Sequence, residues 1–197
     1  AWIADEYRKI HPSDINGAAC VTGKPANKNG LPGREEATGR GVQFIVREFF
    51  RNSDLLKKVK LDENLATKTM IVQGIGNVGY HLSKFLTEED QVKLIGISEY
   101  NGGIYNAEGI NVEHAKKYFK QHKSFSNYPK ATFIKDSSLL LKRGCDILIP
   151  AARENVITEK NAEDISAKLI VEAANGPVSY KANQILNRKK IFVIPDI

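Results

Sequence analysis

One short stretch of this chain has residue types and a spacing that suit phosphate binding. Residues 74–79 read Gly-Ile-Gly-Asn-Val-Gly, a G-x-G-x-x-G run between an apolar run and a helical pattern. Gly74 permits a tight turn, Gly76 lets the backbone approach a diphosphate, and Gly79 lets a helix pack closely on a strand. The free amides at the start of that helix then face the phosphates. The predicted cofactor-binding residues of this run are Gly74, Gly76, Asn77, Val78 and Gly79.

The next candidate residue is Glu99, which lies about 20 positions beyond the glycine run and closes the apolar run 94–98. A carboxylate at this place accepts hydrogen bonds from both ribose hydroxyls of NAD and repels the extra phosphate of NADP. We therefore expect NAD as the cofactor, with NADP possible. Two simpler interpretations stay open at this point, since Glu99 could be a solvated strand-end residue and methyltransferases that use S-adenosylmethionine have a similar loop.

The composition gives little support for binding to nucleic acids, metals or membranes. The net charge is +6 and the sequence pI is near 9.2, but the basic residues are scattered. The short clusters 57–58, 116–117 and 188–190 fall where solvated helix faces or ends are expected, so no nucleic-acid partner is predicted. Cys20 and Cys145 have no metal ligands spaced beside them, and no metal is expected. No apolar run approaches the ~20 residues that cross a bilayer, and no membrane partner is expected.

The elements that must position these residues follow from hydrophobic periodicity. Apolar runs predict strands, and intervening residues with helical spacing predict helices, one of them amphipathic over 35–51. The first 35 residues are rich in turn motifs and are expected to be irregular. The predicted strands are 69–73, 93–98, 146–150, 168–172 and 191–195, and the further helical stretches lie near 78–86, 112–119, 162–165 and 182–186.

Strands that alternate with helices predict an α/β fold: a Rossmann-like, doubly wound, mostly parallel sheet with helices on both faces. We expect two parts, residues 1–35 as a segment from a domain junction and residues 36–197 as a dinucleotide-binding domain. Pro150 and Pro195 stop two strands at their carboxyl ends. Because ligands of open parallel sheets bind outside those ends, these prolines mark the rim of the predicted site.

Several motifs together resemble the glutamate dehydrogenases of the Glu/Leu/Phe/Val dehydrogenase family. The order and spacing match from Trp2 to the last residue, and the match is nearest to the hexameric, animal-like branch. The motifs that carry the resemblance are CVTGKP at 20–25, GREEATGRGV at 33–42, VQGIGNVG at 72–79, CDILIPAA at 145–152, EAANGP at 172–177 and VIPD at 193–196.

The resemblance implies further site residues. Thr38 is similar to the residue whose hydroxyl meets the nicotinamide carboxamide, and Arg34 to the arginine that holds the carboxylate of the amino acid. Ala151 and Ala152 resemble the small residues beside the adenosine part of the cofactor. Asn175 resembles the asparagine that reaches both the substrate and the nicotinamide. Simpler interpretations stay open, since residues 175–177 would serve as an ordinary turn and Arg34 could pair near a helix start.

Departures from the family pattern limit what this chain is expected to do alone. The resemblance places the catalytic lysine and aspartate before Trp2 and an Asn-Ala-Gly-Gly segment after Ile197, so no catalytic residue is expected within the chain. Val178 stands where the family commonly has threonine, and Tyr100 stands where small polar residues are frequent, which further disfavours a 2′-phosphate. The sequence thus looks like a cofactor domain truncated at its C-terminal end.

The expected function is the cofactor-binding part of a glutamate dehydrogenase, an NAD(P)-dependent oxidoreductase of amino-acid metabolism. The implied reaction is the reversible oxidative deamination of L-glutamate to 2-oxoglutarate and ammonia, and the fragment alone is expected to be inactive. The resemblance implies a homohexamer and the mitochondrial matrix, with the cytoplasm as the alternative. A dinucleotide-binding sensor without catalysis also stays open as a function, and so does a dehydrogenase for leucine, phenylalanine or valine.

Overall fold

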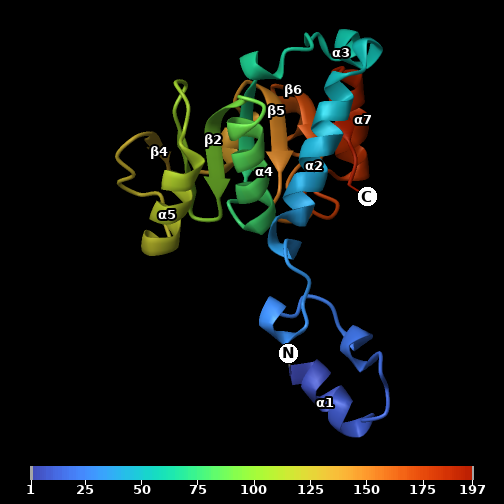
Figure 1. Ribbon diagram of the computed structural model, residues 1–197. Coiled ribbons are helices and arrows are strands. Elements are labelled where there is room, and N and C mark those ends of the chain that lie inside the picture. Colours follow the sequence, from blue (N-terminus) through green and yellow to red (C-terminus); the bar gives the residue numbers. More distant parts are fainter. Residues whose placement is uncertain (1, 197) are drawn as a thin grey trace. The chain divides into compact units, whose positions relative to one another are not determined.

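Seven strands form one sheet in the computed structural model, which describes residues 2–196 (Figure 1). Their order across the sheet is β4-β3-β2-β1-β5-β6-β7. The five predicted strands are all present, and two short strands were not predicted. The bounds are β1 Thr69–Gln73, β2 Lys93–Glu99, β3 Gly102–Tyr105, β4 Thr132–Ile134, β5 Cys145–Pro150, β6 Ala167–Val171 and β7 Phe192–Ile194.

The sheet is mostly parallel, as predicted. β1 pairs in parallel with β2 on one side and with β5 on the other, and β6 and β7 continue the parallel part. β3 and β4 add an antiparallel edge next to β2. The chain leaves β1 toward β2 and returns to the opposite side of β1 at β5. The carboxyl ends of β1 and β5 therefore flank the topological switch point, where ligands of open α/β sheets bind.

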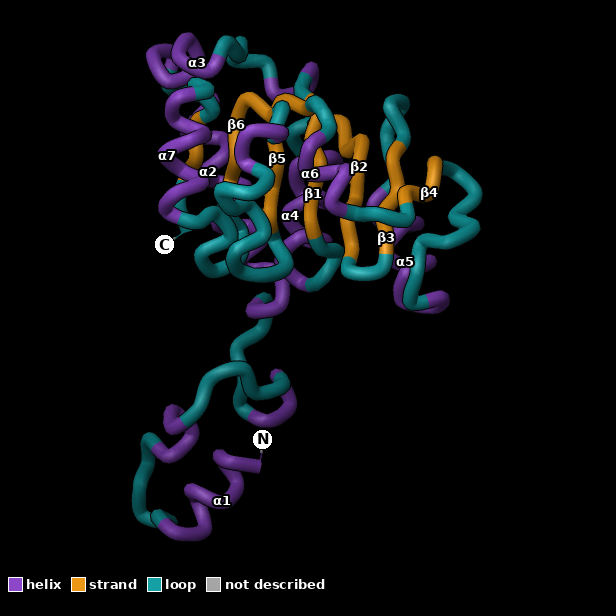
Figure 2. The backbone as a smooth tube through the Cα atoms, turned by 180° about the vertical axis from the view of Figure 1, so that it is seen from behind, coloured by secondary structure: helices purple, strands orange, loops and turns teal. Residues whose placement is uncertain are grey.

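Helices cover both faces of this sheet. They are α2 Arg34–Phe50, α3 Ser53–Val59, α4 Asn77–Glu88, α5 Val112–His122, α6 Ser138–Lys142 and α7 Tyr180–Arg188. Alternate strand residues point to opposite faces: Met70 and Val72 pack in one hydrophobic cluster with α2 to α5, whereas Ile71 packs in a second cluster with α6 and α7. Figure 1 shows α2 and α4 in front of the strands, and Figure 2 shows α6 from behind.

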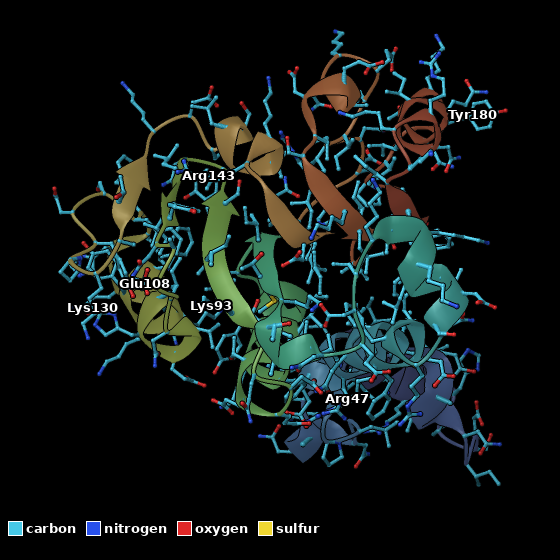
Figure 3. The ribbon with its side chains drawn as sticks, turned by 90° about the horizontal axis from the view of Figure 1, so that it is seen from above. Arg47, Lys93, Glu108, Lys130, Arg143 and Tyr180 are labelled. Atoms are coloured by element: carbon cyan, nitrogen blue, oxygen red, sulfur yellow. The ribbon has the colours of Figure 1, made fainter. Side chains whose placement is uncertain are left out.

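A view from above separates the two helical layers (Figure 3). Arg47 of α2 lies on one side of the sheet, and Arg143, which ends α6, lies on the other with Tyr180 of α7. The doubly wound α/β fold expected from the sequence is confirmed. Polar caps fix several helix starts: Asn111 accepts the amide of His114 at the start of α5, and Ser179 accepts the amide of Ala182 at the start of α7.

The chain divides into two compact units, one up to Ala37 and one from Thr38 onward. The first unit is not wholly irregular, and that expectation was wrong for residues 2–10, which form α1 (Trp2–Ile10). The apolar residues Trp2, Ile3 and Ile10 of this helix are exposed. The helix therefore lacks the buried apolar face by which the other helices could be predicted. The Tyr7 hydroxyl donates to Asp14 and so joins α1 to the segment after it, whereas the exposed Lys9–Glu6 ion pair of 3.0 Å lies within the helix. Two 3-10 turns follow, η1 (Gly17–Cys20) and η2 (Ala26–Lys28).

One predicted helix is also absent as such. Residues 162–165 form only a single 3-10 turn, η4 (Ala162–Asp164), in the connection between β5 and β6. Asn161 fixes this connection locally, because its side chain accepts the amide of Thr158 and donates to the carbonyl of Val156. These side-chain bonds to the backbone compete with a longer helix. Another 3-10 turn, η3 (Leu65–Thr67), precedes β1.

Candidate functional site

The three glycines of the run 74–79 differ in what surrounds them. Gly74 directly follows β1 and has φ +91°, a left-handed conformation that favours glycine. A Cβ on Gly79 would lie 2.0 Å from the carbonyl oxygen of Gly74, so any side chain there would force α4 away from β1. A Cβ on Gly76 would meet nothing within 4 Å. The loop is therefore tight beneath the helix and open at Gly76.

The start of α4 offers free hydrogen-bond donors beside this open position. Within residues 2–196, the amides of Gly76, Asn77 and Val78 donate to no protein acceptor. Such amides, together with the positive end of the helix dipole, form an anion-binding site. The geometry suits a phosphate group, which would accept several of these bonds at once.

Glu99, the last residue of β2, lies against the same loop. Its Oε1 accepts a hydrogen bond of 2.6 Å from the amide of Ile75, and the residue is half-buried. Sequence reasoning placed this carboxylate at the strand end but did not foresee that it braces the loop. No protein donor within residues 2–196 reaches Oε2, so that oxygen can accept a further hydrogen bond.

Lys116 is a residue of this region that sequence reasoning missed, and the expectation of a solvated lysine pair at 116–117 is wrong for it. Its Nζ donates a 2.6 Å hydrogen bond to the carbonyl oxygen of Ile75 and lies 5.3 Å from the centre of the Tyr80 ring. Burial lowers the pKa of the Lys116 ammonium, and the nearby Glu99 charge opposes that shift. The neighbouring Lys117 is exposed. The two lysines differ in the structure because α5 packs with Lys116 toward the loop, and the sequence gives no sign of that packing.

Ala151 and Ala152, at the end of β5, lie beside the glycine loop. The amide of Ala151 donates to the carbonyl oxygen of Gln73 at 2.9 Å, which extends the pairing of β1 with β5. A Cβ on Gly74 would lie 2.8 Å from the Cβ of Ala152, so the two segments are in close contact. The fold thus brings together the loop, Glu99 and the two alanines, all from the carboxyl ends of neighbouring parallel strands.

A second group of predicted residues lines a cavity of about 260 Å³ near the ends of β6 and β7. Thr38 contributes from α2 and Asn175 from the turn after β6, and both are exposed. Gly41, Val42, Ile45, Ala173, Ala174 and Pro195 supply most of the remaining wall. Glu172 and Asp196 line it as well, so the cavity has a largely apolar wall that also carries two carboxylates, a hydroxyl and an amide.

Two carboxylates fix the turn that carries Asn175. Glu172 is 9% exposed and accepts the amides of Val178 at 3.0 Å and Asp196 at 2.9 Å. Asp196 accepts in turn the amide of Gly176 at 2.7 Å. Burial raises the pKa of the Glu172 carboxyl, although the two amides favour its charged form. Both residues belong to motifs that carry the family resemblance, yet their bracing role depends on tertiary contacts that no spacing reveals.

Arg34 belongs to the first compact unit. Its Nη2 lies 3.4 Å from the hydroxyl of Thr22, and it lines a cavity of about 660 Å³ formed by residues between Ala18 and Ala37. Lys24 lines the same cavity and donates to the carbonyl oxygens of Ala18 and Val21. That Arg34 and Asn175 act on one substrate stays a prediction, as do the roles of the other site residues.

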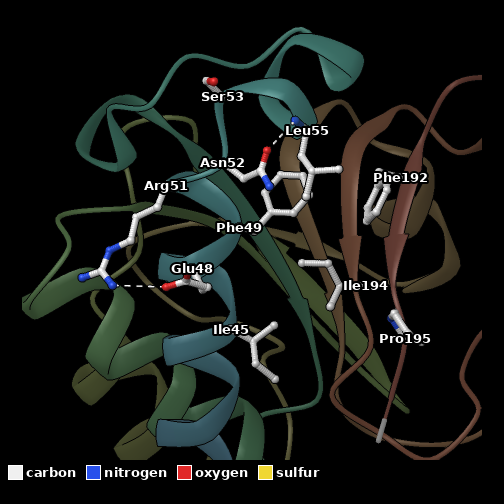
Figure 4. Close-up of a pocket in the computed structure, with 10 residues that line it drawn as sticks. All are labelled: Ile45, Glu48, Phe49, Arg51, Asn52, Ser53, Leu55, Phe192, Ile194 and Pro195. Carbon is white, nitrogen blue, oxygen red and sulfur yellow. Dashed lines mark hydrogen bonds and ion pairs between the residues drawn. The ribbon is translucent and has the colours of Figure 1, made fainter.

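A further groove, of about 600 Å³, contains none of the predicted site residues (Figure 4). Phe49 and Leu55 approach it from α2 and α3, and Phe192 and Ile194 line it from β7. The ion pair of Glu48 with Arg51, 3.1 Å, lies at its margin. Its lining has no cluster of catalytic groups, so this groove is a feature of the sheet edge rather than a candidate active site.

Other kinds of site find no support in the described residues. No group of three or more His, Cys, Asp or Glu side chains between residues 2 and 196 could hold a metal ion. Within the same range, no helix combines the length and the apolarity needed to cross a membrane. Cys145 is buried in β5, and burial raises the pKa of its thiol to about 12, so it is no nucleophile at neutral pH.

Comparison with known sequences agrees with the resemblance. The sequence model of the Glutamate/Leucine/Phenylalanine/Valine dehydrogenase family matches residues 30–197. "Glutamate dehydrogenase, mitochondrial" of Dictyostelium discoideum is 47% identical over 197 residues, which are 100% of this chain and 39% of that protein. "Catabolic NAD-specific glutamate dehydrogenase RocG" of Bacillus subtilis is 39% identical over 198 residues, covering 100% of this chain and 43% of its own length.

Solved structures show the same relationship. Glutamate dehydrogenase from Peptoniphilus asaccharolyticus superposes with a TM-score of 0.73 at 32% identity, over 99% of this chain and 42% of that one. The hetero-hexameric glutamate dehydrogenase from Thermus thermophilus, in a Leu-bound form, gives a TM-score of 0.82 at 27% identity, over 99% and 43%. The chain therefore spans about two fifths of the length of these proteins.

Proposed function

Because this chain belongs to the Glutamate/Leucine/Phenylalanine/Valine dehydrogenase family, we propose that it is the cofactor-binding part of a glutamate dehydrogenase. The proposed reaction is the reversible oxidative deamination of L-glutamate to 2-oxoglutarate and ammonia. Glutamate is chosen over leucine, phenylalanine and valine because the similar proteins named above are glutamate dehydrogenases over the whole length of this chain.

One observation carries the proposal: the loop that is closed beneath α4 and open at Gly76, with free amides on one side and Glu99 on the other. A dinucleotide needs donors for its diphosphate and an acceptor for its ribose hydroxyls. Gly76, Asn77 and Val78 would supply the donors, and Oε2 of Glu99 would supply the acceptor. The residues present therefore fit a nicotinamide dinucleotide.

The nicotinamide ring supplies the hydride acceptor when the cofactor is bound. The proposed work of the chain is to hold and orient. Ala151 and Ala152 flank the adenosine portion without obstructing it, and Thr38 and Asn175 provide a hydroxyl and an amide for the nicotinamide end, where Asn175 also reaches the substrate. Arg34 is proposed to bind the substrate carboxylate through its guanidinium group. Orientation of this kind can lower a bimolecular barrier by ~7–11 kcal/mol.

NAD is the proposed cofactor rather than NADP. A half-buried carboxylate at the ribose position accepts hydrogen bonds from hydroxyls but repels a 2′-phosphate, and Glu99 is fixed there by its bond to Ile75. The name of the Bacillus subtilis relative, which calls it NAD-specific, agrees with this choice for that protein. NADP remains a weaker ligand in the proposal.

Assembly and location are proposed by similarity. The Thermus thermophilus relative is named hetero-hexameric, and the Dictyostelium discoideum relative is named mitochondrial. We propose a homohexamer in the mitochondrial matrix for the full-length protein, with the cytoplasm as the alternative. The domain division, with residues 36–197 as the cofactor domain and residues 1–35 as a junction with the substrate domain, belongs to the same proposal.

Calorimetric titration of NAD and NADP into the chain and two Glu99 variants tests the cofactor assignment. The wild type is expected to bind NAD at least about tenfold tighter than NADP, because a like charge disfavours the 2′-phosphate. Glu99→Gln keeps an acceptor for the Ile75 amide but removes the charge. The ratio of the affinities for NAD and NADP should therefore fall about tenfold. Glu99→Ala removes the ribose acceptor as well and should weaken NAD itself.

The matched control is Glu108→Gln, which removes the charge of an exposed glutamate outside the loop. This variant should bind both nucleotides as the wild type does. Equal affinity of the wild type for NAD and NADP would disprove the role of Glu99. If the wild type bound neither NAD nor NADP, the proposed function would be disproved.

A further inference from the structure

Lys116 and Glu99 hold two consecutive peptide groups of the glycine loop from different elements. Oε1 of Glu99 accepts the N–H of Ile75 at 2.6 Å, which fixes the Gly74–Ile75 peptide. Nζ of Lys116 donates to the C=O of Ile75 at 2.6 Å, which fixes the Ile75–Gly76 peptide. Two oppositely charged side chains, one from β2 and one from α5, thus restrain one loop residue.

The bond from Lys116 also determines where the next amide points. In a trans peptide the N–H lies opposite the C=O. Since the carbonyl oxygen of Ile75 points toward Lys116, the N–H of Gly76 must point away from Lys116. This amide has no protein acceptor within residues 2–196, and it is one of the donors assigned above to the cofactor diphosphate.

Gly76 makes this restraint necessary. The backbone there has φ −69°, and a Cβ would meet nothing within 4 Å. Glycine adopts positive and negative φ about equally well, so rotation of the Ile75–Gly76 peptide meets little steric resistance from this residue. A rotated peptide would turn the carbonyl oxygen toward the diphosphate and replace an attraction by a repulsion. The opening that admits the cofactor therefore leaves the peptide orientation weakly determined by the loop itself.

Lys116 is itself held in position by α4. Its ammonium lies 5.3 Å from the centre of the Tyr80 ring, a distance that allows a cation–π interaction. The Tyr80 hydroxyl donates to Glu113 at 2.7 Å, and Lys84 donates to the same carboxylate at 2.6 Å. Glu113 lies one turn before Lys116 on α5. The ammonium is thus placed by a network that joins the two helices beside the loop.

We propose that Lys116 is a positioning residue for the cofactor: it fixes the Ile75–Gly76 peptide so that the Gly76 amide faces the diphosphate. The proposal rests on the proposed function, since it assigns the role of one more side chain in the same site. Lys116 touches the loop and needs no contact with the cofactor. Lys116 should therefore affect the affinity for the diphosphate portion of the ligand and leave the affinity for the adenosine portion unchanged.

Titration of ligands that differ in the diphosphate tests this role in the chain. Lys116→Met keeps most of the aliphatic stem and removes the ammonium; it should weaken NAD and ADP-ribose about tenfold, the loss expected for one hydrogen bond to a charged group. Adenosine, which has no phosphate, should bind as it does to the wild type. Lys116→Arg retains a donor and should recover most of the affinity.

Lys117→Met is the matched control, because it removes a charge from the neighbouring exposed position of the same helix. It should bind all three ligands as the wild type does. Equal binding of NAD to Lys116→Met and the wild type would overturn the proposal while leaving the proposed function intact. A parallel loss of adenosine binding would also overturn it, because the variant would then have damaged the whole site. Failure of the wild type to bind NAD would overturn both.

A second measurement needs no ligand. The amide signal of Gly76 in a ¹⁵N-correlated NMR spectrum should be single and sharp in the wild type, in Lys116→Arg and in Lys117→Met. In Lys116→Met we expect it to broaden or to split, because the peptide samples two orientations. An unchanged Gly76 signal in Lys116→Met would contradict the proposed restraint.

Discussion

The glycines of the candidate site are the residues for which sequence reasoning and structure can be compared atom by atom. The spacing predicted a tight turn, an open approach and a close packing, and Gly74, Gly76 and Gly79 have surroundings of these three kinds. What they bind is still a prediction. Of these three glycines, only Gly76 adjoins open space. A substitution at Gly76 should therefore affect ligand binding, whereas one at Gly74 or Gly79 should affect folding.

Gly79→Ala is expected to destabilise the fold by about 2 kcal/mol or more. The added Cβ would lie 2.0 Å from the carbonyl oxygen of Gly74, and overpacking of this kind forces the backbone to shift. Gly41→Ala is the control, since that helical glycine has no neighbour within 4 Å of an added Cβ. It should be neutral or stabilising by up to ~1 kcal/mol. Urea denaturation measures both, and equal stabilities would refute the close packing of α4 on β1.

Glu172 gives a prediction about pH. Burial raises the folded-state pKa of the Glu172 carboxyl above the ordinary value of 4.5. At a pH between 4.5 and that raised pKa, the folded chain keeps a proton that the unfolded chain has released. The stability of the wild type relative to Glu172→Gln should therefore be greatest below pH 4.5 and fall as pH rises through the folded-state pKa. Denaturation of both proteins at several pH values checks this sign, and a relative stability that rises with pH would contradict it.

Single residues outside motifs were the hardest to predict. Lys116 stands in a lysine pair on an amphipathic helix and has the pattern of a solvated residue, yet it bonds to Ile75. Asp196 and Glu172 were visible as members of motifs, but their hydrogen bonds to the Asn175 turn join two strand ends. Such contacts depend on how elements pack, and one sequence carries no signal for them.

Whole elements were predicted where burial leaves a long apolar pattern. β1, β2, β5 and β6 are buried on both faces and read as apolar runs, which made them easy to locate. β3 and β4 are short, and β3 contains two adjacent glycines, so neither shows a strand pattern. α6 has only five residues and shows too little periodicity for a prediction.

The contact between α2 and Asp90, two residues beyond the end of α4, is predicted to stabilise the compact unit that begins at Thr38. Asp90 accepts 2.7 and 2.6 Å hydrogen bonds from Arg47 and Gln43, and its side chain is only 10% exposed. Asp90→Asn should destabilise the chain by about 1–2 kcal/mol, because an amide replaces a charged acceptor in a partly buried network.

The control for that element is the surface pair of Glu48, on α2, with Arg51, which directly follows the helix. Its side chains are 74% and 75% exposed, so Glu48→Gln should change the free energy of unfolding by less than about 0.5 kcal/mol. Urea denaturation at low and high salt compares the two variants. If Asp90→Asn is no more harmful than Glu48→Gln, the network does not stabilise this contact.

At the scale of the whole molecule, binding of the cofactor is proposed to be separate from the chemistry of the substrate. The chain spans about two fifths of the length of its relatives. The family resemblance places the catalytic lysine and aspartate outside it. We therefore expect the 197-residue chain to bind NAD but to produce no NADH from glutamate. A full-length glutamate dehydrogenase serves as the positive control in the absorbance assay, and turnover by the purified chain would refute this separation.

The most direct test of the central claim is a crystal structure of the chain with NAD bound. We predict that the diphosphate lies within hydrogen-bond distance of the amides of Gly76, Asn77 and Val78, and that the adenosine ribose is bonded to the carboxylate of Glu99. NAD bound elsewhere, or a loop at 74–79 in which the protein's own side chains occupy that position, would contradict it.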